Sequence, residues 1–137
     1  MSDNKTPYAL VADDDVIIRL HAVEILETAG FRVKEAGDVE EALALLNADA
    51  ERFQLLFTDV QMPPSERTGF DLARECAANW PHIGILVCSG MMQPEAGEMP
   101  DGAVFVQKPF SAKVVYDHLQ KILPDGRKPD PLKTMAP

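Results

Sequence analysis

Short apolar runs alternate along this chain with segments whose apolar residues recur every three or four positions. Runs of the first kind predict buried β-strands, and the spacing of the second kind is typical of amphipathic helices. The predicted strands are residues 8–12, 31–36, 53–58, 83–88 and 103–107. Four helices are predicted: the first ends at Gly30, the second begins after the N-cap Asp38, and the third runs from 69 to 79. The last follows the fifth strand and begins after the N-cap Ser111, with Val114, Val115, Leu119 and Ile122 facing inward.

This alternation of strands and helices predicts the fold class. Strand–helix–strand units build a parallel sheet with helices on both faces, and right-handed crossovers restrict the layout to a doubly wound α/β sheet. In such sheets functional groups gather at the carboxyl ends of the strands. We therefore expect the chemistry of this protein at the residues that directly follow its strands.

Two regions depart from the regular alternation. Residues 89–102 contain Pro94, Gly97, Pro100 and Gly102, which predicts a fourth helix that is shortened or irregular, of one turn at most. The last fourteen residues contain four prolines and little apolar content, which predicts a disordered tail. The expected organisation is a short N-terminal tail (1–6), one domain (7–123) and a disordered C-terminal tail (124–137).

Composition excludes several classes of protein. A length of 137 residues suits one domain, and a net charge of −9 argues against a basic nucleic-acid-binding face. The two cysteines, Cys76 and Cys88, lie in apolar segments without metal-type spacing, as expected of reduced thiols in the cytoplasm. The N-terminus lacks a signal-peptide pattern, and no apolar run reaches the roughly 18 residues needed to span a bilayer. We expect a cytoplasmic protein without membrane insertion.

Polar residues follow four of the predicted strands. They are Asp13 and Asp14 after the first, Asp59 after the third, Ser89 after the fourth and Lys108 after the fifth. Carboxylates that converge stay ionised only beside a cation, and Mg²⁺ prefers such hard oxygen ligands. A carboxylate can also attack phosphorus and form an acyl phosphate if a metal ion and a lysine offset the charge repulsion.

Each of these residues has a structural interpretation as well. Asp13 and Asp14 could cap the helix that follows, a role that Asp15 fits best. Asp59 could be a surface acid, Ser89 could satisfy a backbone group, and Lys108 could be a solvated loop charge.

Four short motifs, taken together, resemble a known family. "VADDD", "FTDVQMP", "CSG" and "VQKPF" occur in this order at strand ends. With these motifs in this order, the sequence from Tyr8 to Leu123 resembles the receiver domain of two-component response regulators. The resemblance implies a flavodoxin-like five-stranded sheet with strand order 2-1-3-4-5. One departure is the spacing from Asp59 to Gly69, which is ten residues and about two longer than usual in the family.

The resemblance also implies a metal site and its residues. Asp59 matches the aspartate that accepts a phosphoryl group. Asp13, Asp14, Asp59 and the backbone carbonyl of Gln61 match the ligands of Mg²⁺, the implied cofactor.

Further residues match the family's phosphoryl-binding and switch positions. Ser89 and Lys108 match the hydroxyl and the ammonium that bind the phosphoryl group, and Phe105 matches the aromatic residue whose rotamer follows the switch. Pro109 matches a proline whose peptide bond with the preceding lysine is usually cis.

The function that follows is a stand-alone response regulator. It would accept a phosphoryl group on Asp59 from a sensor histidine kinase or a histidine phosphotransfer protein, then act by contact with a downstream protein or by onward phosphotransfer. Apart from its own phosphorylation and dephosphorylation it would not be an enzyme, and no output domain is expected after residue 123. There are three alternatives: a Mg²⁺-dependent phosphohydrolase, a receiver-like module that never carries phosphate, and a phosphate sink. Against the phosphohydrolase, Gln61 stands where such an enzyme usually has a second acid.

Overall fold

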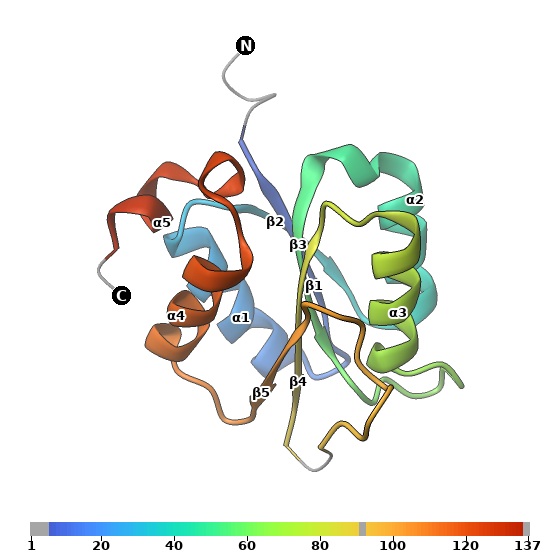
Figure 1. Cartoon of the computed structure of the whole chain (residues 1–137). Helices are drawn as coiled ribbons and strands as arrows, with labels where there is room; N and C mark the ends of the chain where they lie inside the picture. The colour runs from blue at the N-terminus through green and yellow to red at the C-terminus, as the bar shows by residue number, and fades with distance from the viewer. Residues whose placement is uncertain (1–5, 91–92, 136–137) are drawn as a thin grey trace.

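The computed structural model describes residues 6–90 and 93–135, and it confirms the predicted doubly wound α/β fold. Five parallel strands form one sheet in the order β2-β1-β3-β4-β5 (Figure 1), so that β2 lies on one side of β1 and β3 on the other. The predicted residues 1–5 of the N-terminal tail lie outside the described part of the chain. The strands are β1 (Tyr8–Ala12), β2 (Arg32–Ala36), β3 (Phe53–Asp59), β4 (Gly84–Ser89) and β5 (Val104–Gln107).

Helices cover both faces of this sheet. In Figure 1, α1, α4 and α5 lie on one side of the strands, and α2 and α3 lie on the other. Their bounds are α1 (Val16–Thr28), α2 (Val39–Asp49), α3 (Gly69–Asn79), α4 (Ala112–Ile122) and α5 (Asp130–Thr134), with 3₁₀ turns η2 (Ala50–Arg52) and η3 (Asp125–Arg127).

Side-chain caps fix where the longer helices begin. The Asp15 carboxylate accepts hydrogen bonds from the backbone of α1, and the predicted caps Asp38 and Ser111 do the same for α2 and α4. Thr68 forms a capping box with Asp71 at the start of α3. These caps satisfy backbone N–H groups that a helix cannot pair internally, so each strand-to-helix turn has a defined end.

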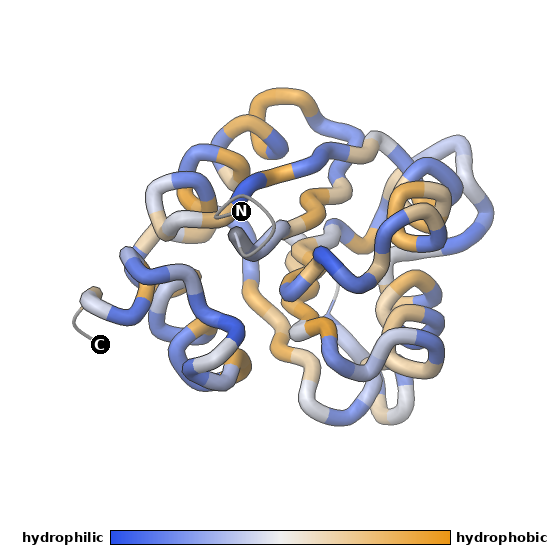
Figure 2. Tube along the Cα trace, turned by 90° about the horizontal axis from the view of Figure 1, so that it is seen from above, coloured by the Kyte–Doolittle hydropathy of each residue, from blue (hydrophilic) through white to orange (hydrophobic). Residues whose placement is uncertain are grey.

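Two apolar clusters fill the space between the sheet and its helices. One lies under α2 and α3 around Leu10, Leu56 and Phe70, and the other lies under α1 and α4 around Phe57, Leu86 and Leu119. Figure 2 shows the apolar residues gathered along the central strands and on the helix sides that face them. Burial of both faces explains why the central strands read as continuous apolar runs.

The connection between β4 and β5 contains no helix in its described part, residues 93–103, as the prolines and glycines there predict. It is instead held against α3. The Arg74 guanidinium donates a hydrogen bond to the Glu98 carbonyl oxygen over 2.6 Å and also pairs with Asp71, and Met99 packs on the cluster under α3.

The structure corrects the expectation of a disordered C-terminal tail. Residues 125–127 and 130–134 form η3 and α5, and the Leu132 side chain has no exposed surface. The Gln120 side-chain amide donates hydrogen bonds to the carbonyls of Leu132 (2.7 Å) and Met135 (3.3 Å). The surface that receives this segment comes from α1 and α4, so the composition of the segment could not indicate its order. Residues 136 and 137 lie outside the described part.

A second correction concerns the inward face of α4. Val115 and Leu119 are buried as expected, and the half-buried Ile122 packs against the cluster under α1 and α4, whereas Val114 is exposed. Val115 and Leu119 are four residues apart and lie on one stripe, from which Val114 is turned by about 100°.

Replacing Leu132 with alanine tests whether the C-terminal segment belongs to the folded domain. We expect the free energy of unfolding to fall by about 2–4 kcal/mol, because a fully buried leucine is lost from the cluster under α1 and α4. Chemical denaturation followed by circular dichroism measures the change. The neighbouring exposed residue provides the control, since Lys133→Ala should change stability by no more than about 0.5 kcal/mol. Equal stability of Leu132→Ala and wild type would contradict the docking of this segment.

Candidate functional site

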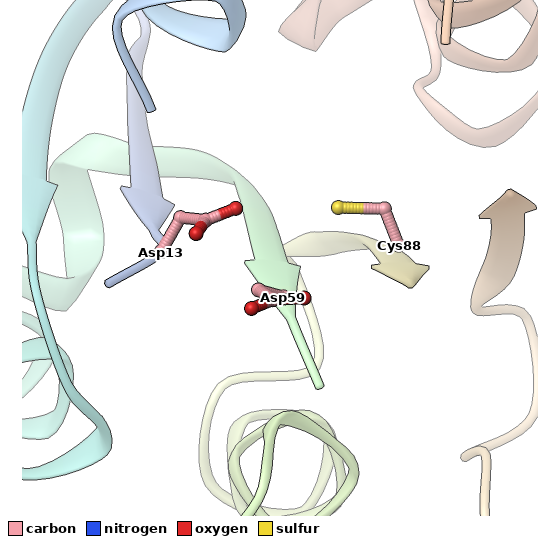
Figure 3. A group of neighbouring side chains, drawn as sticks. All are labelled: Asp13, Asp59 and Cys88. Atoms are coloured by element: carbon pink, nitrogen blue, oxygen red, sulfur yellow. The ribbon is translucent and has the colours of Figure 1, made fainter. Parts of the chain in front are cut away.

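The carboxyl ends of β1, β3 and β5 bring two carboxylates and one ammonium group together. Lys108 Nζ lies 3.1 Å from Asp13 Oδ2 and 3.0 Å from Asp59 Oδ1. Asp13 is only 2% exposed and Asp59 only 7%. Figure 3 shows Asp13 at the end of β1 and Asp59 at the end of β3, with their side chains around the same space. Residues 13, 59 and 108, remote in sequence, therefore form one buried ionic cluster.

Backbone contacts hold Asp13 in this cluster. Its N–H donates to the Ala36 carbonyl on β2 over 3.0 Å, and its Oδ1 accepts from the Asp15 N–H over 2.9 Å. Because Oδ1 is held by the start of α1 and Oδ2 by Lys108, both oxygens of this carboxylate have defined partners.

Asp59 is positioned by the last residues of β3 and the first of α3. The Thr58 hydroxyl donates to the Asp59 carbonyl oxygen over 2.9 Å, and the Gly69 N–H donates to the Val60 carbonyl oxygen over 2.7 Å. A Cβ atom on Gly69 would lie only 1.8 Å from the Asp59 carbonyl oxygen. The start of α3 thus rests directly on the backbone of Asp59, an approach that requires glycine.

Lys108 enters from the loop after β5. Its N–H donates to the Ser89 carbonyl oxygen over 2.9 Å, and its peptide bond to Pro109 is cis, the isomer that the resemblance implies. Ser89 is buried at the end of β4 and Phe105 is half-buried on β5. The backbone bond places the ends of β4 and β5, and hence Ser89 and Lys108, side by side.

Burial and charge shift the pKa values of this cluster. Burial raises the pKa of the Asp59 carboxyl above its usual value, and the Asp13 charge adds to the rise, while the hydrogen bond from Lys108 opposes it. Burial lowers the pKa of Lys108, but its contacts with Asp59 outweigh burial and leave that pKa raised. Lys108 therefore stays a cation at neutral pH, and Asp59 keeps a more basic carboxylate than an exposed aspartate has.

Two of the predicted metal ligands lie outside the buried ionic cluster. Asp14 and Gln61 are exposed, and the Asp14 carboxylate is not part of the buried group. Cys88, which the sequence predicted only as a reduced thiol in an apolar segment, is part of it: its Sγ, Asp13 and Asp59 offer ligand atoms within 4.8 Å of one another (Figure 3). Burial raises the pKa of the Cys88 thiol, which keeps it neutral. Its place on β4, one residue before Ser89, was the one available signal.

The donor set fits a hard divalent cation. The carboxylates of Asp13 and Asp59 converge on Lys108, and the next residue after Asp13, the exposed Asp14, carries a third carboxylate. Carboxylate and carbonyl oxygens are ligands that Mg²⁺ takes, usually together with several waters, whereas it does not take a neutral thiol. The carboxylates therefore fit Mg²⁺.

Comparison with known proteins decides the family. The family model for the response regulator receiver domain matches residues 9–120. The chain belongs to this family. As a receiver it is 31% identical over 118 residues to the response regulator receiver protein CpdR of Brucella abortus, a match that covers 83% of this chain and 94% of CpdR. Receivers of this family are generally signal relays of two-component systems rather than enzymes.

The chain is also similar to a sensor kinase and to a chemotaxis protein. It is 30% identical over 117 residues to the sensor kinase CckA of Brucella abortus, covering 83% of this chain but 12% of CckA. The solved structure of the chemotaxis protein CheY4 of Vibrio cholerae superposes with a TM-score of 0.73 at 28% identity, covering 86% of this chain and 99% of CheY4. Within the part of the receiver that the structure describes, no helix is both long and apolar enough to cross a membrane.

Proposed function

We propose that this receiver accepts a phosphoryl group on Asp59 from a phosphohistidine of a sensor histidine kinase or a histidine phosphotransfer protein. The observation that carries the proposal is the ionic cluster, in which the Asp59 carboxylate is nearly buried and lies 3.0 Å from the Lys108 ammonium. The similarity to the sensor kinase CckA supports a two-component context. We further propose a cytoplasmic location, which suits the free thiols of Cys76 and Cys88.

The transfer step is a nucleophilic substitution at phosphorus. A carboxylate oxygen of Asp59 attacks the phosphorus atom, the bond from phosphorus to the donor imidazole nitrogen breaks, and an acyl phosphate forms. The imidazole leaves with the electron pair of that bond. The higher pKa of Asp59 strengthens the nucleophile, because a more basic carboxylate shares its electron pair more readily.

Charge control is the task of the residues around Asp59. Lys108, already paired with Asp59, would pair with an oxygen of the phosphoryl group, and the neighbouring Ser89 hydroxyl would donate a hydrogen bond to another. Mg²⁺, when bound, would neutralise phosphoryl oxygens. It would be held by Asp13, Asp14, Asp59 and the Gln61 carbonyl.

Phosphorylation would then be read out on the surface. A phosphoryl group that recruits Ser89 and Lys108 acts on the ends of β4 and β5, which the Lys108–Ser89 backbone bond joins. We propose that Phe105, half-buried on β5, changes its rotamer with this movement. The β4–β5 connection would follow, and the altered surface would bind a downstream protein or favour onward phosphotransfer.

Exposed apolar side chains mark where the phosphodonor protein would dock. Val16, Ile17 and Leu20 form the outer face of the first turns of α1, directly after the acidic residues, and Ile17 is 76% exposed. A protein that brings a phosphohistidine to Asp59 must contact the surface around the carboxyl ends of β1 and β3. This apolar face can supply the hydrophobic part of that contact.

Incubation with acetyl phosphate and Mg²⁺, followed by intact-mass measurement, tests the proposed function. We expect wild type to gain the mass of one phosphoryl group, in a form that hydrolyses readily, and Asp59→Asn to gain none, because an amide cannot form the acyl phosphate. The exposed residue Asp49, replaced in Asp49→Asn, is the matched control and should leave the gain unchanged. No gain in wild type would indicate a receiver that never carries phosphate, and turnover of diverse phosphate esters would indicate a phosphohydrolase.

Replacing Asp14 with asparagine tests the metal site. We expect Mg²⁺ to raise the Tm of wild type, because bound cation relieves the repulsion among the carboxylates. Asp14→Asn should lose most of that rise, since it removes one charge from the metal ligands. Thermal unfolding with and without Mg²⁺ measures both effects. Undiminished Mg²⁺ stabilisation of Asp14→Asn would contradict the assignment of this ligand.

A further inference from the structure

Arg19, on the second turn of α1, bridges the acidic loop and the neighbouring strand. Its Nη1 donates a hydrogen bond to the backbone carbonyl oxygen of Asp13, and its Nε donates to Glu35 Oε1 near the end of β2, each over 2.9 Å. The arginine side chain is 21% exposed, so most of the guanidinium stem is packed against the protein. The two bonds tie the end of β1 to β2 through one side chain.

This bridge acts on the peptide group between Asp13 and Asp14. The Asp13 N–H is already fixed by the Ala36 carbonyl on β2, and Arg19 fixes the carbonyl on the other side of the same residue. That carbonyl belongs to the peptide that leads into Asp14. Because a peptide group is planar, holding its oxygen also sets the direction in which the Asp14 backbone leaves the loop.

Asp14 depends on this backbone support more than Asp13 does. Both Asp13 oxygens have partners, the Asp15 N–H and Lys108, within the protein. In contrast, the described residues provide no hydrogen bond or ion pair to the exposed Asp14 carboxylate. Its direction is therefore determined chiefly by the peptide that Arg19 holds.

We infer that Arg19 is a positioning residue that presents the Asp13–Asp14 loop to a divalent cation. Glu35 accepts the second hydrogen bond of Arg19 and so orients the guanidinium. The planar fork of arginine suits two acceptors in different directions, which lysine cannot reproduce. This inference rests on the proposed metal site and adds to it a residue that is not itself a ligand.

Positioning and simple charge predict opposite results when Arg19 is replaced. A cation close to a divalent metal site repels the metal, so if Arg19 acted only through its charge, Arg19→Gln would bind Mg²⁺ more tightly. If Arg19 positions the loop, Arg19→Gln would bind Mg²⁺ more weakly, because the ligands are no longer held in place. Losses of about tenfold are typical when a residue that orients metal ligands is removed.

Titration with Mg²⁺ alone, followed by calorimetry and by the shift in Tm, measures this effect without any phosphodonor. We expect Arg19→Gln to raise the Mg²⁺ dissociation constant about tenfold. Arg52→Gln is the matched control, because Arg52 also pairs with a carboxylate, Asp49, but lies before β3 at the opposite end of the sheet. It removes the same charge and should leave the dissociation constant unchanged.

Two further variants separate positioning from charge and from loss of fold. Glu35→Gln keeps an oxygen that accepts the Arg19 hydrogen bond, so we expect its Mg²⁺ affinity to stay close to that of wild type. Arg19→Lys keeps the charge but has one donor group in place of the fork, so its Mg²⁺ affinity should lie between those of wild type and Arg19→Gln. This variant still tests the inference if Arg19→Gln fails to fold.

The outcomes distinguish this inference from the proposed function. Wild-type Mg²⁺ binding together with unchanged or tighter binding by Arg19→Gln or Arg19→Lys would overturn the role of Arg19 and leave the metal site intact. Absence of Mg²⁺ binding in wild type would overturn both. In acetyl phosphate reactions, Arg19→Gln should react slowly at low Mg²⁺ and recover toward the wild-type rate at saturating Mg²⁺.

Discussion

Replacing Gly69 with alanine is expected to destabilise the receiver by more than about 3 kcal/mol, a large part of the stability of a domain of this size. The new Cβ would lie 1.8 Å from the Asp59 carbonyl oxygen and 2.8 Å from the Asp59 carbonyl carbon, distances that no packed structure tolerates. Both obstacles are backbone atoms. The start of α3 would have to move away from β3, and the Gly69–Val60 hydrogen bond would be lost.

Chemical denaturation of Gly69→Ala against Gly126→Ala measures this steric effect. Gly126 has an ordinary φ and no atom within 4 Å of the position of an added Cβ, so its replacement should leave stability close to that of wild type. Gly69→Ala that folds should also phosphorylate poorly, because movement of α3 displaces the backbone of Asp59. Wild-type stability of Gly69→Ala would contradict the close approach of α3 to β3.

Replacing Lys108 with methionine is expected to produce the second large effect. In protein freed of divalent cations by a chelator, Lys108→Met would leave the nearly buried carboxylates of Asp13 and Asp59 without their shared cation. Breaking a buried ion pair by removing one partner costs about 3–5 kcal/mol. At neutral pH we expect the free energy of unfolding to fall by about 3 kcal/mol, the lower limit of that range, because water can still solvate the two carboxylates in part.

The pH dependence of this loss follows from the direction of the Asp59 shift. A carboxyl whose pKa is higher in the folded state than in the unfolded state stabilises the fold below the unfolded pKa, and that contribution disappears as pH rises through the folded pKa. Burial and the Asp13 charge raise the pKa of Asp59, and Lys108 lowers it. Without Lys108 the pKa of Asp59 rises further. The destabilisation by Lys108→Met should therefore be small near pH 4 and grow toward pH 7.

Denaturation curves from pH 4 to 8 in chelator test this expectation. Lys113→Met is the control, because Lys113 also pairs with an aspartate, Asp117, but is well exposed, and such pairs contribute at most about 1 kcal/mol. Adding Asp59→Asn to Lys108→Met should restore much of the lost stability, since one of the two unpaired carboxylates is removed. A loss that is the same at every pH would show that Lys108 stabilises the fold by packing rather than by charge.

The positions of the strand-end residues were predictable because they depend on short-range patterns and one topological rule. Apolar runs of five or six residues located β1, β3 and β4, and parallel strands place their carboxyl ends at one edge. The convergence of Asp13, Asp59 and Lys108 follows from that rule, and the structure confirms that they meet. The prolines and glycines after Ser89 likewise predicted that the connection to β5 would lack a regular helix.

Other features depend on surfaces that distant segments create. The C-terminal segment looks disordered by composition, yet Pro129 and Pro131 pack on Gly30, where an added Cβ would lie 2.7 and 2.8 Å from their atoms. Leu132 is buried only because α1 and α4 together offer it a cluster. No local pattern in residues 124–137 encodes that cluster, so sequence periodicity could not reveal it.

By itself, then, the sequence determined the order of strands and helices, the edge of the sheet that carries the chemistry, and the residue types at that edge. These depend on hydrophobic periodicity and on which residues follow each strand, and both are local properties of the chain. The tertiary structure decided that Cys88 lies beside Asp13 and Asp59, that Arg19 binds the Asp13 carbonyl, and that the start of α3 packs on the Asp59 backbone. Those contacts join segments far apart in sequence, and their distances are determined only when the two faces of the sheet are packed.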